Sequence, residues 1–304
     1  MSENLWTRRD IVRLGTILGL APVLSSARDT SMMQRPIPVS DELLPVIGLG
    51  TYIVFDVEST PANIAVRKAI VDMLAAKGGS LLDSSPMYGR SEKIIGDIIA
   101  AAENRDHLFL ATKVWTDGRT SGEQQMNRSA ALMNTDTIDL MQVHNLRDLD
   151  TQMATIREFQ QEGRIRYNGI THYRSSAFND LERIVNLRKP DFLQINYSLG
   201  ESEADQRILP LAHDLGVAVL VNRPFVTGQL FRAVGNRPLP EWALEFAASW
   251  GQFFLKYITS HPAVTCVIPA TSSTKHMADN LAAGFGALPD ASVRSRMKDL
   301  VESL

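Results

Sequence analysis

The sequence lacks several features that mark common classes of protein. Its 304 residues include one cysteine, Cys266, so no internal disulfide can form. Iron–sulfur clusters and thiolate zinc sites normally need several cysteines and are disfavoured. None of the six histidines forms an i,i+4 pair of the metalloprotease kind, so we predict no metal site. No apolar run reaches the length of about 18 residues that a membrane-spanning helix needs, which argues against an integral membrane span.

An excess of charge of one sign is also missing. The 31 lysines and arginines nearly balance the 34 aspartates and glutamates, giving a net charge of −3. Nucleic-acid-binding proteins usually carry a basic excess or patch, so we expect no nucleic-acid partner. The G-x-S-x-G motif of serine hydrolases is absent. Gly48 and Gly50 are not followed by the third glycine of a G-x-G-x-x-G motif, which argues against an open doubly wound sheet, the alternative architecture.

Short apolar runs alternate with longer amphipathic segments from residue 44 onward. Strands are predicted at 44–49, 80–82, 108–112, 138–143, 166–170, 192–195, 217–221 and 264–268. Helices are predicted at 64–77, 92–102, 122–134, 151–162, 175–187, 203–215, 241–260 and 274–283. Eight strand–helix units indicate an α/β protein with a single (β/α)8 TIM barrel, and 292–304 predicts an extra C-terminal helix. The segment 222–237 is longer than an ordinary loop of this fold, which is typical of functional loops.

Residues 1–27 differ from the rest of the chain. Arg8 and Arg9 precede an uncharged, mostly apolar stretch at 14–24, and small residues at 25–27 suit signal cleavage. We therefore expect a twin-arginine-type signal peptide, recognised by the export machinery, and a periplasmic or exported protein. The alternative is an N-terminal amphipathic helix or tail on a cytoplasmic protein.

The division of the remaining chain follows from its composition. The length allows two domains at about 150 residues each, but barrels of this kind also use it as one. Residues 28–43 are interpreted as a linker because Pro36 and Pro38 break any helix. No shift in composition marks a second domain, so 44–304 is predicted to form one barrel.

Three successive predicted strands end in residues capable of acid–base chemistry. Asp83, Lys113 and His144 follow one another at intervals of 30 and 31 residues, and Tyr88 comes shortly after Asp83. Chemistry in such barrels sits at the carboxyl ends of strands, which lie about 4.8 Å apart, so these side chains should meet at one mouth. Each residue alone could be structural, as a turn cap, a snorkelling lysine or a core histidine. Their coincidence at matching strand ends favours a site.

These side chains suit the reduction of a carbonyl group. A free tyrosine has a pKa of about 10, and a nearby lysine cation lowers it. An aspartate paired with the lysine keeps that cation charged, and a neutral histidine can donate a hydrogen bond to a substrate oxygen. Together they would protonate a carbonyl oxygen while a cofactor delivers hydride to the carbon.

Several ordered motifs make the chain resemble the aldo/keto reductase family over residues 44–304. The motifs are GLGT at 48–51, LDSSPMYG at 82–89, ATKVW at 111–115, DLMQVHN at 139–145, GRIRYNGI at 163–170, QINYS at 194–198, VIPATSS at 267–273 and DN at 279–280. The resemblance implies an NAD(P)H-dependent reductase of an aldehyde or ketone, with Tyr88 as general acid, Lys113 and Asp83 assisting it, and His144 orienting the carbonyl. The chain is most similar to a bacterial subgroup with twin-arginine-type leaders.

The resemblance also implies an extended nicotinamide dinucleotide across the barrel mouth, with NADP(H) favoured over NAD(H). At the strand ends the implied contacts are Gly50, Thr51, Thr171, His172 and Gln194, the last three near the carboxamide. Around the pyrophosphate they are Asn222, Arg223, Pro224, Phe225, Gly228, Gln229 and Leu230. Around the adenosine and its 2′-phosphate they are Ile268, Ala270, Thr271, Ser272, Ser273, His276 and Asn280. The chain departs from the family pattern where Thr171-His172 replaces Ser-Asn and where His276 replaces an arginine.

The sequence also indicates a class of substrate and leaves two alternative functions to consider. Tyr52, Phe55, Met87, Trp115 and Tyr173 lie in strand-end loops and favour an apolar or aromatic carbonyl substrate. A nicotinamide-binding regulatory or accessory protein with little turnover, like the family's channel-subunit branch, is the main alternative. A barrel lyase or isomerase is disfavoured by the apparent adenosine site.

Overall fold

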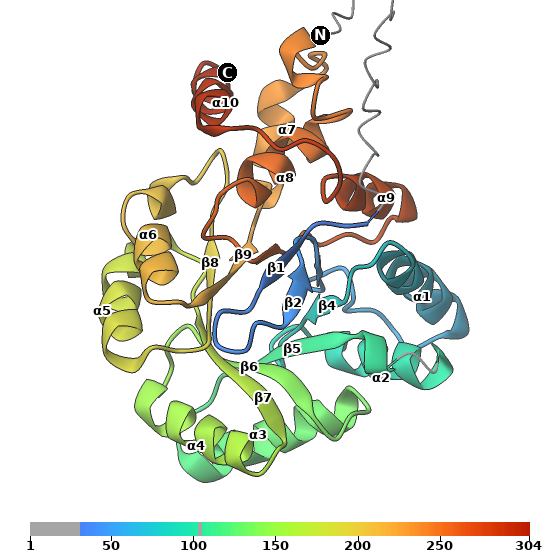
Figure 1. The fold of residues 1–304 in the computed structure, drawn as a ribbon. Coiled ribbons are helices and arrows are strands. Elements are labelled where there is room, and N and C mark those ends of the chain that lie inside the picture. Colours follow the sequence, from blue (N-terminus) through green and yellow to red (C-terminus); the bar gives the residue numbers. More distant parts are fainter. Residues whose placement is uncertain (1–30, 103–104) are drawn as a thin grey trace, which may run out of the picture.

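Eight parallel strands form a closed barrel at the centre of the molecule (Figure 1). The computed structural model describes residues 31–102 and 105–304, so the predicted leader at 1–27 lies outside the described residues. Strand order follows the chain from β3 to β10, and parallel bridges from Ile47 to Val267 and from Gly50 to Ala270 join the two edges. The strands are β3 (Leu49–Gly50), β4 (Leu81–Asp83), β5 (Phe109–Val114), β6 (Ile138–His144), β7 (Ile165–Thr171), β8 (Phe192–Asn196), β9 (Ala218–Asn222) and β10 (Cys266–Val267). The predicted (β/α)8 fold is confirmed.

Helices surround the barrel, and some of them begin after a residue whose side chain caps the first turn. The first helix, α1 (Pro61–Ala76), follows Thr60, whose hydroxyl accepts a hydrogen bond from the backbone nitrogen of Asn63. The others are α2 (Ser91–Ala102), α3 (Arg119–Leu132), α4 (Leu149–Gln161), α5 (Phe178–Arg188), α6 (Ile208–Asp214), α7 (Gln229–Val234), α8 (Trp250–Thr259), α9 (Thr274–Ala282) and α10 (Ala291–Glu302). Side-chain caps also precede α8, α9 and α10. Across the part of the chain that the structure describes, no helix combines the length and apolarity needed to cross a membrane.

Two predicted helices are shorter than the sequence pattern suggested. The segment 203–215 begins with a 3-10 turn, and its α-helix starts only at Ile208. The segment 241–260 likewise begins with a 3-10 turn, and α8 starts at Trp250 after Ser249, whose hydroxyl accepts a hydrogen bond from the backbone nitrogen of Gln252. A serine hydroxyl that accepts a hydrogen bond from a backbone N–H offers that group an alternative to a helical partner. The cap at Ser249 therefore makes α8 begin at Trp250, later than predicted.

A β-hairpin, β1 (Gln34–Pro36) and β2 (Leu43–Pro45), covers the N-terminal end of the barrel. Its residues Ile37 and Leu44 are almost completely buried and join the cluster of side chains inside the barrel. The stretch expected as a linker therefore packs on the barrel over part of its length, and the predicted strand at 44–49 is divided between β2 and β3. The physical reason is that burying these two apolar side chains in the open end of the barrel removes their surface from water, which is favourable.

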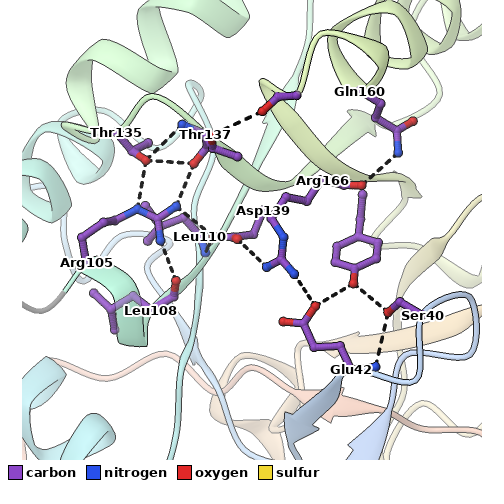
Figure 2. A network of polar contacts seen from close by, with 12 residues as sticks. Ser40, Glu42, Arg105, Leu108, Leu110, Thr135, Thr137, Asp139, Gln160 and Arg166 are labelled. Carbon is purple, nitrogen blue, oxygen red and sulfur yellow. Dashed lines mark hydrogen bonds and ion pairs between the residues drawn. The ribbon is translucent and has the colours of Figure 1, made fainter.

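A polar network holds this hairpin to the barrel strands (Figure 2). Arg166 pairs with Glu42 of the hairpin and donates to Asp139 at 2.8 Å. Asp139 also accepts hydrogen bonds from the backbone nitrogen of Leu110 at 2.8 Å and from Arg105 at 3.1 Å. The carboxylate is nearly buried, and these donors offset the cost of removing it from water.

Candidate active site

Inward-facing side chains change from apolar to polar along the barrel strands. Successive side chains of a strand alternate between its two faces, so the residue two positions after an inner-core residue also points inward. The inner-core residues and the polar residues that follow them are Leu81 and Asp83, Ala111 and Lys113, Leu140 and Gln142, and Phe192 and Gln194. The barrel is therefore filled by apolar groups below and carries a layer of polar groups at its carboxyl end.

Asp83 and Lys113 form a buried ion pair in this polar layer. The Nζ atom of Lys113 lies 2.7 Å from Oδ2 of Asp83 and donates a second hydrogen bond to the carbonyl oxygen of Ser84 at 2.6 Å. Both side chains are at most 3% exposed. Burial lowers the pKa of Lys113, but the charge of Asp83 and the hydrogen bond to its carboxylate oppose this effect, and the pKa lies above its usual value. Lys113 is therefore a cation at neutral pH.

Two glutamines complete the shell around Asp83. Gln142 donates to Oδ1 of Asp83 at 3.1 Å, and Gln194 donates to the same oxygen at 2.8 Å. The amide oxygen of Gln194 faces Thr171 and Asn222, at 3.2 and 3.4 Å. Gln142 was not predicted, although it is a polar residue two positions before His144 in an apolar strand. Gln194 thus links the ion pair to the strand ends expected to hold the carboxamide.

Tyr88 stands above the ion pair on the loop after β4. The Nζ atom of Lys113 lies 5.0 Å from the centre of its ring. Burial raises the pKa of Tyr88, and the charge of Lys113 lowers it by less, so the pKa lies above its ordinary value. The sequence predicted the sign of the lysine effect but not that burial exceeds it. The phenol is consequently protonated at neutral pH.

Gly89 fixes the direction of this loop. Its φ of +61° lies in the left-handed region, and a β-carbon there would come within 2.3 Å of the Asp56 carboxylate. That carboxylate accepts a hydrogen bond from the backbone nitrogen of Arg90 at 3.0 Å. A residue with a side chain would be strained at this position and would displace Asp56, so Gly89 allows the turn that presents Tyr88.

His144 ends β6 beside Tyr88, with 6.2 Å between the two ring centres. Burial, and then the positive charge of Lys113, lower the pKa of His144 to about 3. The imidazole is therefore neutral at physiological pH and can donate one hydrogen bond, as the sequence suggested. The structure brings together Asp83, Lys113, Tyr88 and His144, all four residues predicted for catalysis.

The residues predicted at the strand ends divide into structural and accessible ones. A β-carbon on Gly50 would lie 2.8 Å from the carbonyl oxygen of Ile268, so this glycine permits the close approach that shuts the barrel. Thr51 is fully buried and donates to the carbonyl oxygen of Asp83 at 2.9 Å. His172 is partly exposed, and its ring stacks on Tyr173 with 5.6 Å between the ring centres. His172 is therefore accessible from the barrel mouth, whereas Gly50, Thr51 and Ile268 support the backbone.

The loop after β9 carries strained backbone and unpartnered polar atoms. Arg223, Val226 and Thr227 adopt positive φ values of 53°, 47° and 54°. Such conformations are costly for side-chain-bearing residues and cluster at functional sites. Oδ1 of Asn222 and Nε of Arg223 are buried without a hydrogen-bond partner among the described residues. These atoms fit a nicotinamide dinucleotide, which would offer amide donors to Asn222 and phosphate oxygens to Arg223.

Other residues of this loop serve its own packing. Phe225 packs on Phe231 at 4.9 Å between ring centres, and Leu230 is 4% exposed. Pro224 is buried, while Gln229 is exposed beside Gly228, whose φ is +80°. The predicted pyrophosphate segment is therefore a compact loop that leads directly into the short helix α7.

The start of α9 presents hydroxyl groups, the Lys275 ammonium and the His276 imidazole next to the β10 end. Ser273 caps the helix by accepting from the backbone nitrogen of His276 at 3.4 Å, while Ser272, Lys275 and His276 are exposed. Unpaired backbone N–H groups at such a terminus favour phosphate. The other predicted residues here are Thr271, which accepts from the backbone nitrogen of Ser273, Ala270, which bridges to Gly50, and Asn280, which is 5% exposed.

Four of the five predicted substrate residues lie at the rim, and one does not. Tyr52, Met87 and Tyr173 are 58%, 46% and 37% exposed, and Tyr52 packs edge-on against Tyr88 at 5.0 Å. Trp115 is partly buried and lies near His144. Phe55 is completely buried in the main hydrophobic cluster, so its expected place at the rim is wrong. Its backbone nitrogen donates to the carbonyl oxygen of Thr51 at 3.1 Å, and the loop folded by this bond turns the ring into the core.

The barrel, its buried ion pair and the partly buried tyrosine beside it define an oxidoreductase that acts on carbonyl groups with a nicotinamide cofactor. The sequence profile of the aldo/keto reductase family matches residues 46–300, and the chain belongs to this family. It is 26% identical to the oxidoreductase YqkF of Bacillus subtilis, over 83% of this chain and 91% of that protein. It is 25% identical to the methylglyoxal reductase YeaE of Escherichia coli, over 83% of this chain and 89% of that protein.

Solved structures share the fold. The holo form of the aldo-keto reductase AKR11C1 from Bacillus halodurans superposes with a TM-score of 0.72 at 24% identity, covering 88% of this chain and 96% of that one. An aldo-keto reductase from Klebsiella pneumoniae in complex with NADPH gives a TM-score of 0.73 at 21% identity, covering 89% and 96%.

Proposed function

We propose that the protein reduces an aldehyde or ketone to an alcohol with Tyr88 as the proton donor. The observation that carries this proposal is the position of the Lys113 cation, held by Asp83 and 5.0 Å from the centre of the Tyr88 ring. Tyr88 gives its phenolic proton to the carbonyl oxygen of the substrate, and the lysine cation stabilises the phenolate that remains. His144 donates a hydrogen bond to the same oxygen. The nicotinamide cofactor, when bound, supplies the hydride.

The cofactor is proposed to lie along the strand ends and to be NADP(H) in preference to NAD(H). Gln194, Asn222 and Thr171 would hold the carboxamide, and Arg223 would face the pyrophosphate. The exposed hydroxyl, ammonium and imidazole groups at the start of α9, on Ser272, Lys275 and His276, support a site for a 2′-phosphate. The NADPH complex of the aldo-keto reductase from Klebsiella pneumoniae is consistent with this preference.

The substrate is proposed to be a small apolar or aromatic carbonyl compound. Tyr52, Met87, Trp115 and Tyr173 form an apolar rim that would exclude water from the reacting group. Methylglyoxal belongs in a test panel because it is the substrate in the name of the relative YeaE. Aromatic aldehydes and a charged sugar aldehyde complete the comparison, and we expect the aromatic compounds to give the higher kcat/KM.

Two measurements test the function and its alternative. NADPH and NADH are titrated against the protein, and NADPH oxidation is then followed with the carbonyl panel. Turnover supports the reductase, whereas cofactor binding without turnover on any carbonyl would favour the regulatory or accessory protein. Absence of nicotinamide binding would exclude both. Lys275→Ala should weaken NADPH binding and leave NADH binding unchanged, and a parallel loss for both nucleotides would exclude a 2′-phosphate contact.

We also propose that residues 1–27 act as a twin-arginine-type leader that directs the folded protein to the periplasm. The support is the Arg8-Arg9 pair, the apolar stretch at 14–24 and the small residues at 25–27. N-terminal sequencing of the protein from its native cells tests the proposal, since an intact N-terminus in the cytoplasmic fraction would contradict it.

A further inference from the structure

The ring of His144 contacts a second side chain whose role the proposed mechanism leaves open. Ser85 lies on the loop after β4 and is completely buried. Its Oγ atom lies 3.2 Å from Nδ1 of His144 and accepts a hydrogen bond from the backbone nitrogen of Met87, also at 3.2 Å. Among the described residues these are the hydrogen-bond partners of this hydroxyl.

The surroundings of Ser85 decide which atom carries the proton between it and His144. A serine hydroxyl has one proton to donate and two lone pairs that accept. If Nδ1 carried the proton, Ser85 would accept from both Met87 and His144. Its own buried proton would then have no acceptor within the described part of the chain. If Ser85 donates to Nδ1, every one of these groups is paired, and buried donors strongly favour pairing.

A neutral imidazole carries its single proton on one of two nitrogens. The Lys113 cation lies on the same inward layer and disfavours a second proton on the ring. With Nδ1 occupied as an acceptor, the remaining proton belongs on Nε2. The rings of Tyr88 and Trp115 flank His144, with ring centres at 6.2 and 6.4 Å, and mark the side where a substrate would approach.

We propose that Ser85 is a positioning residue that fixes His144 as the Nε2–H tautomer and so directs the imidazole N–H at the carbonyl oxygen of the substrate. The statement about the substrate rests on the proposed carbonyl reduction. The tautomer itself does not, because it is a property of the protein without substrate. Ser85 acts through His144 and does not touch the reacting atoms.

Nitrogen chemical shifts of the imidazole rings test the tautomer directly. The full chain is labelled with 15N-histidine, and the signals of His144 are assigned as those missing from His144→Asn. We expect the wild type to show a protonated Nε2 and an unprotonated Nδ1. In Ser85→Ala the two nitrogens should move toward averaged values as the second tautomer becomes populated, and Ser85→Thr, which keeps the hydroxyl, should restore the wild-type pattern.

Ser84→Ala is the matched control. Ser84 is an adjacent, equally buried serine, but its hydroxyl bonds to Thr51 at 3.1 Å instead of His144. This variant should lose stability as Ser85→Ala does, while its His144 shifts stay unchanged. A protonated Nδ1 in the wild type, or shifts in Ser85→Ala equal to those of the wild type, would overturn the proposal. The wild-type spectrum decides the tautomer even if a variant fails to fold.

Kinetics test the link to the reaction. Ser85→Ala should lower kcat for carbonyl reduction by about tenfold, because part of the protein then holds the wrong tautomer, while the Kd for NADPH is unchanged. An unchanged kcat together with altered ring shifts would show that the tautomer does not serve the substrate. If the wild type reduces no carbonyl, the proposed function fails while the tautomer measurement remains valid.

Discussion

The Nζ atom of Lys113 lies 2.7 Å from Oδ2 of Asp83 and 5.0 Å from the centre of the Tyr88 ring. One buried cation therefore neutralises a carboxylate and also faces the phenol that we propose as the proton donor. This arrangement gives each member of the group a separate and measurable role.

Tyr88→Phe should abolish proton donation while leaving the predicted cofactor contacts at the barrel mouth intact. We expect kcat for carbonyl reduction to fall by about 10²–10⁴-fold, because general acid catalysis typically contributes this much. The Kd for NADPH should stay unchanged, since the predicted cofactor contacts lie on other strand ends. Steady-state kinetics and fluorescence titration check both values. Turnover of Tyr88→Phe near that of the wild type would show that Tyr88 is not the proton donor.

Lys113→Met should raise the pKa of Tyr88 further, because the cation that opposes the effect of burial is gone. Reduction requires the protonated phenol, so its activity is lost as pH rises through this pKa, and the loss should move to higher pH. Turnover should fall at neutral pH because the phenol is a weaker acid. An unchanged pH–rate profile would contradict this role.

The same substitution leaves Asp83 buried without its cation, which should lower the free energy of unfolding by about 3–5 kcal/mol. The double variant Lys113→Met/Asp83→Asn removes both charges and should recover much of that loss, although it stays inactive. Denaturant unfolding of the wild type and the two variants separates the electrostatic effect from the catalytic one. Equal stability of the single and double variants would show that the two glutamines alone satisfy Asp83.

Acid should destabilise the protein through its buried histidines. Burial lowers the pKa of His144 to about 3 and that of His261 to about 4, below the unfolded value of 6.5. Their contribution to stability is complete above pH 6.5 and is lost as pH falls toward the folded values, since the unfolded chain binds the protons first. Each group can add up to about 1.4 kcal/mol per pH unit to the slope. Unfolding at pH 7, 6, 5 and 4 measures this slope.

His144→Asn should flatten that slope, and His213→Asn serves as its control because the His213 side chain is 61% exposed. The control should unfold with the wild-type pH dependence. Equal slopes for His144→Asn and the wild type would mean that the pKa of His144 is not lowered in the native protein.

Phe55 and Tyr52 lie three residues apart and should respond differently to truncation. Phe55→Ala removes a completely buried ring and should lower the free energy of unfolding by about 3–5 kcal/mol. Tyr52→Ala removes a ring that is 58% exposed, so it should mainly raise KM for aromatic substrates. Thermal unfolding and kinetics on both variants test this. A large change in KM with little loss of stability for Phe55→Ala would show that Phe55 contacts the substrate, as the sequence predicted.

The sequence predicted most of the barrel because its strands are apolar runs repeated at regular intervals. It also predicted Asp83, Lys113 and His144, since each is the polar residue at or near the end of such a run. Gln142 was not predicted as a site residue. Its side chain points into the barrel, but this direction can be assigned only once the register of the strands is known. Phe55 was misplaced because local loop hydrogen bonds, not periodicity, decide which way its ring turns.

The hairpin at the start of the described chain was not predicted for a different reason. Its strands are three residues long each and contain prolines, so they carry no alternating pattern. Their stability comes from Ile37 and Leu44 filling the barrel end and from the Glu42–Arg166 pair, which joins residues far apart in sequence. Contacts between residues so far apart in sequence exist only once the barrel has closed, so local sequence patterns do not predict them.

The same hairpin determines how the enzyme can be tethered. Met33 donates its backbone N–H to the carbonyl oxygen of Gly284, just beyond the C-terminal end of α9, at the face of the barrel opposite Tyr88. A support attached at residue 31, in a variant that lacks residues 1–30, would therefore join the molecule on its closed side. The catalytic opening then points away from the attachment, and substrates reach an anchored enzyme from the free solution.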